Sequence, residues 1–438
     1  MAAAPSTPQR PAAGPRPVRV LKFGGTSMGT TPEALARIAR IVASVHRHSD
    51  VAVVVSARGD ATDRLIEEAH SASATPPARE LDQLMATGEA RSAALLAIAL
   101  DELRVPAVSL LGGQAGFTVS GRHTDGRIQD IATARLRQIL ARGEVAVVAG
   151  FQGVNEAGDV VTLGRGGSDT SAVALAVALG AAVCEIYTDV DGVFSADPRV
   201  VPQAHLIPVI RNSVMSEMAQ SGARVLHPRS VELSGRAGVS LHVRSTFSQR
   251  QGTVVVPDQE GAETAMVESP GSVTAVTHEP GSARVTVVGV GPDAPPPGTE
   301  VLVLLAGASV PVDMMTRFAD ASGRHGWAFT VPAADVATVT GLLASPSRKV
   351  TVDPAVAKVS VVGAGLLSDP RVLGRALDAL LAVGTEPLAL TTSRSRISVM
   401  VAEADCAGAV AALHEEFLPA PGSPGAAHRP TVAVGSPA

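Results

Sequence analysis

Short, almost continuously apolar segments alternate with helical stretches over the first 257 residues of the chain. Val51–Ala57 is one such segment, and Val18–Phe23 is another, which ends at a pair of glycines. Strands that are apolar on both faces, with helices between them, are typical of a largely parallel sheet covered on two sides. The pattern therefore predicts an α/β fold. Further strands are predicted at 107–111, 144–151, 184–190 and 241–245, and helices at 81–103, 128–142, 168–179 and 216–234. A helix is also predicted to start at Pro32, with Thr31 as its N-cap.

The rhythm of the sequence changes after about residue 257, where we expect the first domain (18–257) to end. Residues 258–280 combine Gly, Pro, Glu and Ser with little periodicity, which predicts a linker. Predicted strands at 283–290 and 358–363 share a charged residue followed by V-[TS]-V-V-G, a weak repeat of about 70 residues. We expect two small α+β modules in tandem, at 281–355 and 356–418. A leader over 1–17 and a tail over 419–438 are expected to be disordered.

Composition argues against several classes of function. The chain has a net charge of −5 and ten aromatic residues (one Trp, one Tyr and eight Phe), so it lacks the footprint of a nucleic-acid-binding protein. No apolar run approaches the roughly 20 residues that span a membrane, and the leader lacks the apolar core of a secretory signal. Cys184 and Cys406 indicate buried thiols in a reducing compartment. A cytoplasmic enzyme is the inference.

Lysine is rare in this chain. Of its 36 basic residues three are lysine, and Lys22 precedes the other two by more than three hundred positions. Chance is one explanation. The other is that position 22 requires a compact point charge that a guanidinium group does not replace.

Three glycine-bearing or acidic loops follow predicted strands and precede helices, a placement that suits phosphate. In the first, 22–27, Gly24 and Gly25 let the backbone approach an anion while Lys22 neutralises a phosphoryl group in flight. A purely structural turn is the alternative.

The second loop, 163–170, places three glycines around Arg165 at the start of a helix. An arginine held there suits bidentate capture of a carboxylate. The plainer interpretation is that Ser168 or Asp169 is a helix N-cap.

The third loop, 187–199, holds three aspartates and Arg199 at the end of a strand, where α/β folds place ligands. It predicts a nucleotide-phosphate or metal neighbourhood, with an acidic surface turn as the alternative.

These loops belong to a run of motifs that resembles the aspartate kinase (aspartokinase) family. The motifs are K-F-G-G-T-S at 22–27, T-G-E at 87–89, A-G-F-Q-G-V at 149–154, T-L-G-R-G-G-S-D-T at 162–170, C-E-I-Y-T-D-V-D-G-V-F-S-A-D-P-R at 184–199 and V-L-H-P-R-S-V-E at 225–232. The resemblance implies an amino-acid-kinase-like αβα sandwich followed by two ACT-like modules. It also implies transfer of the γ-phosphoryl group of ATP to the side-chain carboxylate of L-aspartate, the first step toward lysine, threonine and methionine.

The resemblance implies a role for each matching residue. Lys22 and Asp169 match the catalytic positions, with Asp169 arranging the lysine. The aspartate-binding positions are Thr62, Glu89, Arg165 and Ser168. The ATP-binding positions are Lys22, Phe23, Gly24, Gly25, Thr188, Asp189, Phe194, Arg199, Arg224 and Val225. Mg²⁺ is expected to be held mainly by the ATP phosphates. Since an aspartate side chain in water ionises with a pKa of about 3.9, the acceptor carboxylate needs no general base.

Departures from the family pattern leave two alternatives for the reaction. Arg58 and Ala61 stand where the family usually has Met and Thr, and Phe194 and Arg224 replace a usual Tyr and Lys. A retuned pocket would make the chain a kinase of another small acidic amino acid. A non-catalytic ligand-sensing subunit on the same scaffold is the other alternative, against which the intact Lys22 argues.

The second half resembles the paired regulatory ACT domains more loosely. At 385–389 the sequence T-E-P-L-A lacks the asparagine amide and the strand-edge N–H that would bind an amino-acid effector. We therefore hypothesise a weak response to lysine plus threonine. The family suggests homodimers or higher homo-oligomers joined through these modules, although Pro387 sits where an edge strand would pair. Met266 is a candidate internal start in the linker.

Overall fold

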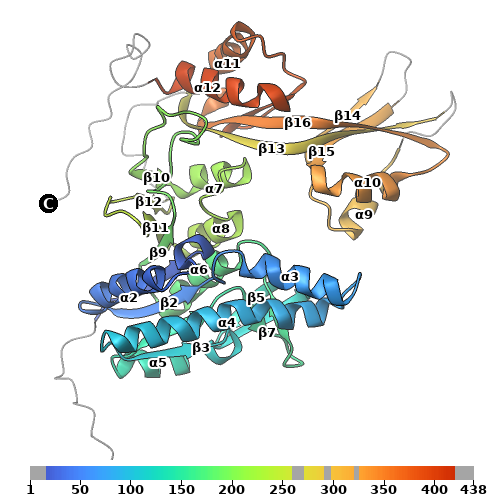
Figure 1. The fold of residues 1–438 in the computed structure, drawn as a ribbon. Helices are drawn as coiled ribbons and strands as arrows, with labels where there is room; N and C mark the ends of the chain where they lie inside the picture. The colour runs from blue at the N-terminus through green and yellow to red at the C-terminus, as the bar shows by residue number, and fades with distance from the viewer. Residues whose placement is uncertain (1–15, 259–270, 291–296, 320–324, 420–438) are drawn as a thin grey trace, which may run out of the picture. The chain divides into compact units, whose positions relative to one another are not determined.

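A computed structural model describes residues 16–258, 271–290, 297–319 and 325–419 (Figure 1). All but the first residue of the predicted tail, most of the predicted leader, and Met266 lie outside these ranges. The chain divides into two compact units, and the division is not a single cut. The first unit runs to Val193 and resumes at Leu206–Ala219 and from Arg224, whereas the second contains Phe194–His205, Gln220–Ala223 and the C-terminal part of the chain.

The first unit contains an eight-stranded sheet in the order β10-β12-β11-β9-β1-β2-β6-β3. Its pairs are parallel except β11 with β12. The strands are β1 (Val18–Phe23), β2 (Asp50–Val55), β3 (Ala107–Leu110), β6 (Val145–Ala149), β9 (Val183–Thr188), β10 (Val209–Arg211), β11 (Ser240–Ser245) and β12 (Thr253–Val256). This confirms the mainly parallel sheet.

Helices cover both faces of this sheet. Apolar residues of α2 and α4 form one core with alternate residues of β1, β2 and β6, while α5, α6 and α8 contact strands of the sheet as well. The helices are α1 (Gly25–Met28), α2 (Pro32–His46), α3 (Ala61–Ala72), α4 (Ala78–Glu102), α5 (Ala134–Ala141), α6 (Gly167–Leu179), α7 (Asn212–Gln220) and α8 (Pro228–Ala237). The predicted start of α2 is confirmed, because Pro32 is its first residue and Thr31 Oγ1 accepts a hydrogen bond from the N–H of Ala34.

A smaller sheet in the order β5-β4-β7-β8 corrects one predicted helix. Its strands are β4 (Phe117–Arg122), β5 (Asp125–Ile131), β7 (Gln152–Val154) and β8 (Val160–Thr162). The helix predicted at 128–142 is therefore wrong at its start, since Ile128–Ile131 pairs with β4 as a hairpin. The helix predicted at 216–234 is two helices, because the chain turns at Gly222 (φ +100°) and restarts at Pro228.

The second unit contains a six-stranded antiparallel sheet in the order β14-β15-β13-β16-β18-β17. The strands are β13 (Ser272–Gly289), β14 (Asp313–Ala319), β15 (His325–Pro332), β16 (Arg348–Ala364), β17 (Ala389–Thr392) and β18 (Arg396–Ala402), and the helices are α9 (Glu300–Gly307), α10 (Val336–Leu343), α11 (Pro370–Ala382) and α12 (Cys406–Phe417).

The two halves of this sheet share their long strands. The C-terminal half of β13 packs with α9 and α10 in one core, and the C-terminal half of β16 packs with α11 and α12 in another. Because β13 begins at Ser272, the linker predicted at 258–280 is wrong from that residue on. Residues 272–279, which precede the predicted first module, pair with the C-terminal half of β16 and so add a strand segment to the second module.

Among the described residues, none of the helices is both long and apolar enough to cross a membrane.

Candidate active site

Lys22 lies where the first and second predicted loops of the first unit meet. It lies near the end of β1, and its Nζ is 2.6 Å from Oδ1 of Asp169 in the first turn of α6. The two side chains are only 11% and 13% exposed, so the ion pair is largely withdrawn from water. The structure thereby joins the first and second predicted loops.

Glycines at the end of β1 permit a close approach of backbone to charge. A Cβ on Gly24 would lie 3.2 Å from Nζ of Lys22, and one on Gly25 would lie 3.0 Å from the carbonyl oxygen of Ala57. The N–H of Gly59 also donates to the carbonyl of Gly25 (3.0 Å). The turn after β1 thus lies directly against the turn after β2, with backbone rather than side chains facing the ammonium group.

The loop before α6 contains two glycines in the left-handed region. Gly164 has φ +73° and Gly166 has φ +68°, conformations that other residues adopt at a cost. A side chain on Gly166 would also collide with His227, since its Cβ would lie 2.0 Å from that ring. This geometry buries Ser168 and turns Asp169 to Lys22, while the side chain of Arg165 stays exposed.

Glu89 on α4 is a buried carboxylate with one oxygen unused. Its side chain accepts a hydrogen bond at Oε1 from the N–H of Ala57 (3.0 Å), whereas Oε2 is buried without a partner among the described residues. Burial raises the pKa of Glu89 to about 7, against the effect of the Ala57 hydrogen bond. A buried carboxylate in this condition gains strongly from a cationic ligand. Thr62, in the first turn of α3, is half-buried.

The end of β9 lies beside the end of β1. The carbonyl of Tyr187 accepts hydrogen bonds from the N–H of Gly24 and from Ser27 Oγ, both at 3.3 Å. The ring of Tyr187 stacks on Phe23 with centroids 4.7 Å apart. Thr188 and the exposed Asp189 follow, with a 3.1 Å hydrogen bond between their side chains. The third predicted loop therefore begins next to the glycine turn.

The remaining nucleotide positions divide between the units. Arg224, which is exposed, and Val225, which is half-buried, belong to the first unit. Phe194 and Arg199 belong to the second, where Arg199 pairs with Asp197 at 2.7 Å. The first unit alone thus does not bring all of the predicted positions together.

The predictions from sequence assigned no role to Asp82 and His227. Asp82 is completely buried on α4, seven residues before Glu89. That spacing places both carboxylates on nearly the same face of the helix, which is the sequence signal that could have identified Asp82. His227 caps α8 and packs on Gly166, and burial lowers its pKa although Asp169 nearby opposes the shift.

The guanidinium group of Arg58 is hydrogen-bonded to the loop before α2 and not to Glu89. Its Nε donates to the carbonyl of Gly29 (2.7 Å) and its Nη2 to that of Thr31 (2.9 Å). It lines a groove of about 590 Å³ with apolar residues of α2 and α4, including Leu35 and Leu95. These contacts weaken the suggestion that Arg58 retunes an amino-acid pocket.

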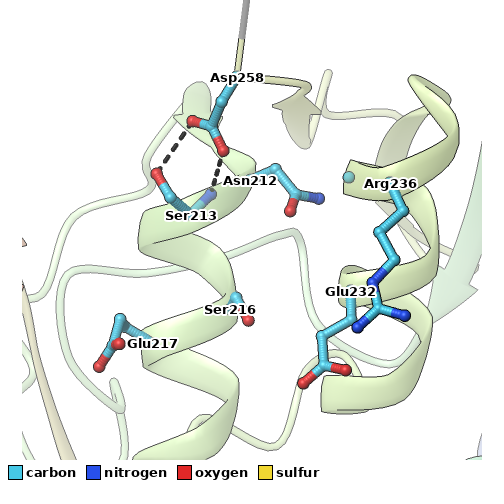
Figure 2. A pocket seen from close by; sticks show the side chains of 8 residues that line it. Asn212, Ser213, Ser216, Glu217, Glu232, Arg236 and Asp258 are labelled. Atoms are coloured by element: carbon cyan, nitrogen blue, oxygen red, sulfur yellow. Dashed lines mark hydrogen bonds between the residues drawn. The ribbon is translucent and has the colours of Figure 1, made fainter.

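Figure 2 shows another pocket, of about 390 Å³, lined by side chains of α7 and α8. Asp258 closes one side of it by accepting hydrogen bonds from the N–H and Oγ of Ser213, both at 2.9 Å. None of the residues that line it belongs to the predicted site.

The chain is similar to known proteins over most of its length. A model of the amino acid kinase family matches residues 17–245, and an ACT domain model matches residues 359–417. The aspartokinase of Corynebacterium efficiens is 41% identical over 406 residues, covering 91% of this chain and 95% of that protein. The aspartokinase of Mycobacterium tuberculosis is 43% identical over 407 residues, with the same coverage.

Solved structures agree with this fold. E. coli aspartokinase III in complex with aspartate and ADP gives a TM-score of 0.75 at 24% identity, covering 91% of this chain and 99% of that one. Its complex with lysine and aspartate gives a TM-score of 0.70 at 25% identity, covering 92% and 99%.

Proposed function

Since the chain belongs to the aspartokinase family and is an ATP-dependent kinase of the aspartate side-chain carboxylate, we propose that the loops around Lys22 form its active site. The observation that carries the proposal is the buried Lys22–Asp169 pair, which lies beside the Gly24–Gly25 turn. That turn contacts the loop of Ala57, whose N–H donates a hydrogen bond to Glu89. A fixed cation next to close-packed backbone is suited to phosphate, and an unpaired buried carboxylate oxygen is suited to an ammonium group.

Aspartate supplies the complementary charges. In our proposal Glu89 binds its ammonium group, the exposed Arg165 clamps its α-carboxylate, and Ser168 and Thr62 line the pocket. The side-chain carboxylate is already ionised at neutral pH, so the residues have to align it and not deprotonate it. The acceptor oxygen then attacks the γ-phosphorus, and ADP leaves.

ATP is proposed to lie along the ends of β1 and β9. Lys22, Phe23, Gly24 and Gly25 would hold the β- and γ-phosphates, and Asp169 would keep Lys22 in place. The nucleotide would be bound by Thr188, Asp189, Phe194, Arg199, Arg224 and Val225. The described residues contain no group of three or more His, Cys, Asp or Glu side chains arranged to hold a metal ion. Mg²⁺ is proposed to be held mainly by the ATP phosphate oxygens, where it would neutralise their charge.

Trapping the product with hydroxylamine tests the reaction and its substrate directly. The full chain with ATP and Mg²⁺ is expected to give aspartyl hydroxamate from L-aspartate. Glutamate is expected to give at least about 100-fold less at equal concentration, because an added methylene shifts the acceptor carboxylate from the phosphoryl group. Equal or better turnover of another acidic amino acid would instead support the alternative substrate.

The regulatory half is proposed to respond weakly to amino-acid effectors. In the turn before β17 the N–H groups of Thr385 and Leu388 already donate to the carbonyls of Leu380 (3.0 Å) and Met400 (2.8 Å), and Pro387 has none to offer. Lysine and threonine at about 5 mM each are expected to change the rate by less than about twofold. A kinase assay with both amino acids titrated together measures this, and strong concerted inhibition would contradict it.

Cytoplasmic location and association into homodimers through the ACT-like unit complete the proposal. The edge position of β17 in the antiparallel sheet supports the latter, since an edge strand offers backbone groups for pairing.

A further inference from the structure

Asp82 is a fully buried carboxylate to which the proposed mechanism gives no role. It lies on α4, two helical turns before Glu89 and therefore on nearly the same face. Its oxygens accept hydrogen bonds from the N–H of Thr124 (3.0 and 3.1 Å) and from Thr162 Oγ1 (2.5 Å), and Nδ1 of His123 lies 2.7 Å away. A buried charge persists only with such compensation, so this network holds its members firmly.

The same network fixes the loop that carries Arg165. Thr162 is the last residue of β8, directly before that loop. Thr124, at the tip of the β4–β5 hairpin, has φ +68°, and its carbonyl oxygen would lie 3.0 Å from a Cβ on Gly164. The loop therefore passes close to the hairpin tip, where a side chain at position 164 would be tightly placed as well as strained by the positive φ of +73°. Asp82 accepts hydrogen bonds from both sides of this contact, from Thr124 on the hairpin and from Thr162 at the start of the loop.

Arg229 on α8 supports the contact from another element. Its Nη1 donates to the carbonyl of Leu163 (2.6 Å) and its Nη2 to that of Gly126 (3.0 Å), so it bridges the loop and the hairpin. Burial lowers the pKa of Arg229, and the neighbouring Arg127 adds to the shift. The loop is therefore hydrogen-bonded to α8 through Arg229, and Thr162 at its start is hydrogen-bonded to Asp82 of α4.

We propose that Asp82 is a positioning residue that sets the place of Arg165 relative to Glu89. Helix α4 then serves both charged groups of the amino acid. Glu89 binds the ammonium group, and Asp82 positions the guanidinium group of Arg165 that binds the α-carboxylate. One tetrahedral carbon joins these two groups of the substrate, so their receptors have to be held in register. A misplacement of about 1 Å can cost about 100-fold in rate. The inference rests on the proposed roles of Arg165 and Glu89.

The test compares aspartate with its α-amide, in which a neutral amide replaces the α-carboxylate. With ATP saturating, KM for aspartate and Ki of the amide as a competitor are measured in the full-chain enzyme and in Asp82→Asn and Thr162→Val. We expect KM for aspartate to rise at least about tenfold in Asp82→Asn and less in Thr162→Val. Ki of the amide and KM for ATP are expected to stay within about twofold. Asp101→Asn, an exposed change on the same helix, is the matched control.

Arg165→Ala separates this inference from the proposed function. If that variant keeps the wild-type ratio of KM to Ki, the role assigned to Arg165 is wrong. If it raises the ratio while Asp82→Asn and Thr162→Val leave the ratio unchanged, the role of Asp82 is overturned. Equal losses for aspartate and the amide would also overturn it, since they indicate general disruption. Thr162→Val removes one hydroxyl from a site of nearly unchanged shape, so it decides the question if Asp82→Asn fails to fold.

Discussion

Lys22→Ala is expected to lower kcat at least about 1,000-fold while leaving the fold intact. The ammonium group is the fixed charge at the glycine turn, and loss of one preorganised donor already costs about 100- to 1,000-fold in other enzymes. Its removal also leaves Asp169 without its partner at 2.6 Å, so an uncompensated negative charge would face the phosphates. Steady-state hydroxamate formation at saturating ATP and aspartate measures the loss.

Two further variants sharpen this result. Lys22→Arg is expected to restore little activity, because the space between Gly24 and Asp169 fits a compact ammonium group and not a planar fork. Lys349→Ala removes an exposed lysine in the second unit and is the control. A Lys22→Ala enzyme that retains more than about a tenth of wild-type kcat would remove Lys22 from the catalytic machinery.

Glu89→Gln is expected to weaken aspartate binding and to stabilise the free protein. We expect KM for aspartate to rise about 100-fold or more, because the neutral amide cannot pair with the ammonium group. In the wild type, KM should also rise as pH falls below about 7, where Glu89 becomes protonated. Assays across pH 6–9 at saturating ATP measure both effects.

The stability effect has the opposite sign. The folded state raises the pKa of Glu89 from 4.5 to about 7, so its contribution to stability is present below 4.5 and is lost as pH rises through 7. The cost at pH 8 is up to about 3 kcal/mol. Glu89→Gln should therefore unfold at a higher temperature than the wild type at pH 8, and the two should differ little near pH 5. Glu102→Gln, exposed on the same helix, is the control, and a pH-independent difference would contradict the explanation.

Elements with strong local signals could be predicted from the sequence. The start of α2 is encoded by Thr31 and Pro32, and β1 is encoded by an apolar run that stops at glycine. The sequence predicts a linker over the first part of β13 because residues 258–280 combine Gly, Pro, Glu and Ser with little periodicity. That part forms a strand because β16, far along the chain, supplies its hydrogen-bonding partner.

The site shows the same division between local and long-range information. The sequence places Lys22, Arg165 and Asp169 at or just after strand ends. It does not reveal the Lys22–Asp169 contact, which joins β1 of the large sheet to the helix that follows β8 of the smaller sheet. Nothing local to Glu89 reveals that one of its oxygens lacks a partner, or that Asp82 is hydrogen-bonded to two separate segments, the β4–β5 hairpin tip and the end of β8. Both depend on what the fold brings to α4.

The membership of Phe194–His205 in the second unit limits how this protein can be dissected. Ala196 and Val201 lie in the core built by α11 and α12, and Ser195 Oγ lies 2.9 Å from Nε2 of His414. A fragment ending near residue 258 would expose Ala196 and Val201 to solvent. A fragment that starts after residue 258 would lack them and would have a cavity in the core of α11 and α12. A boundary drawn near residue 258 therefore deprives the second unit of part of its own core.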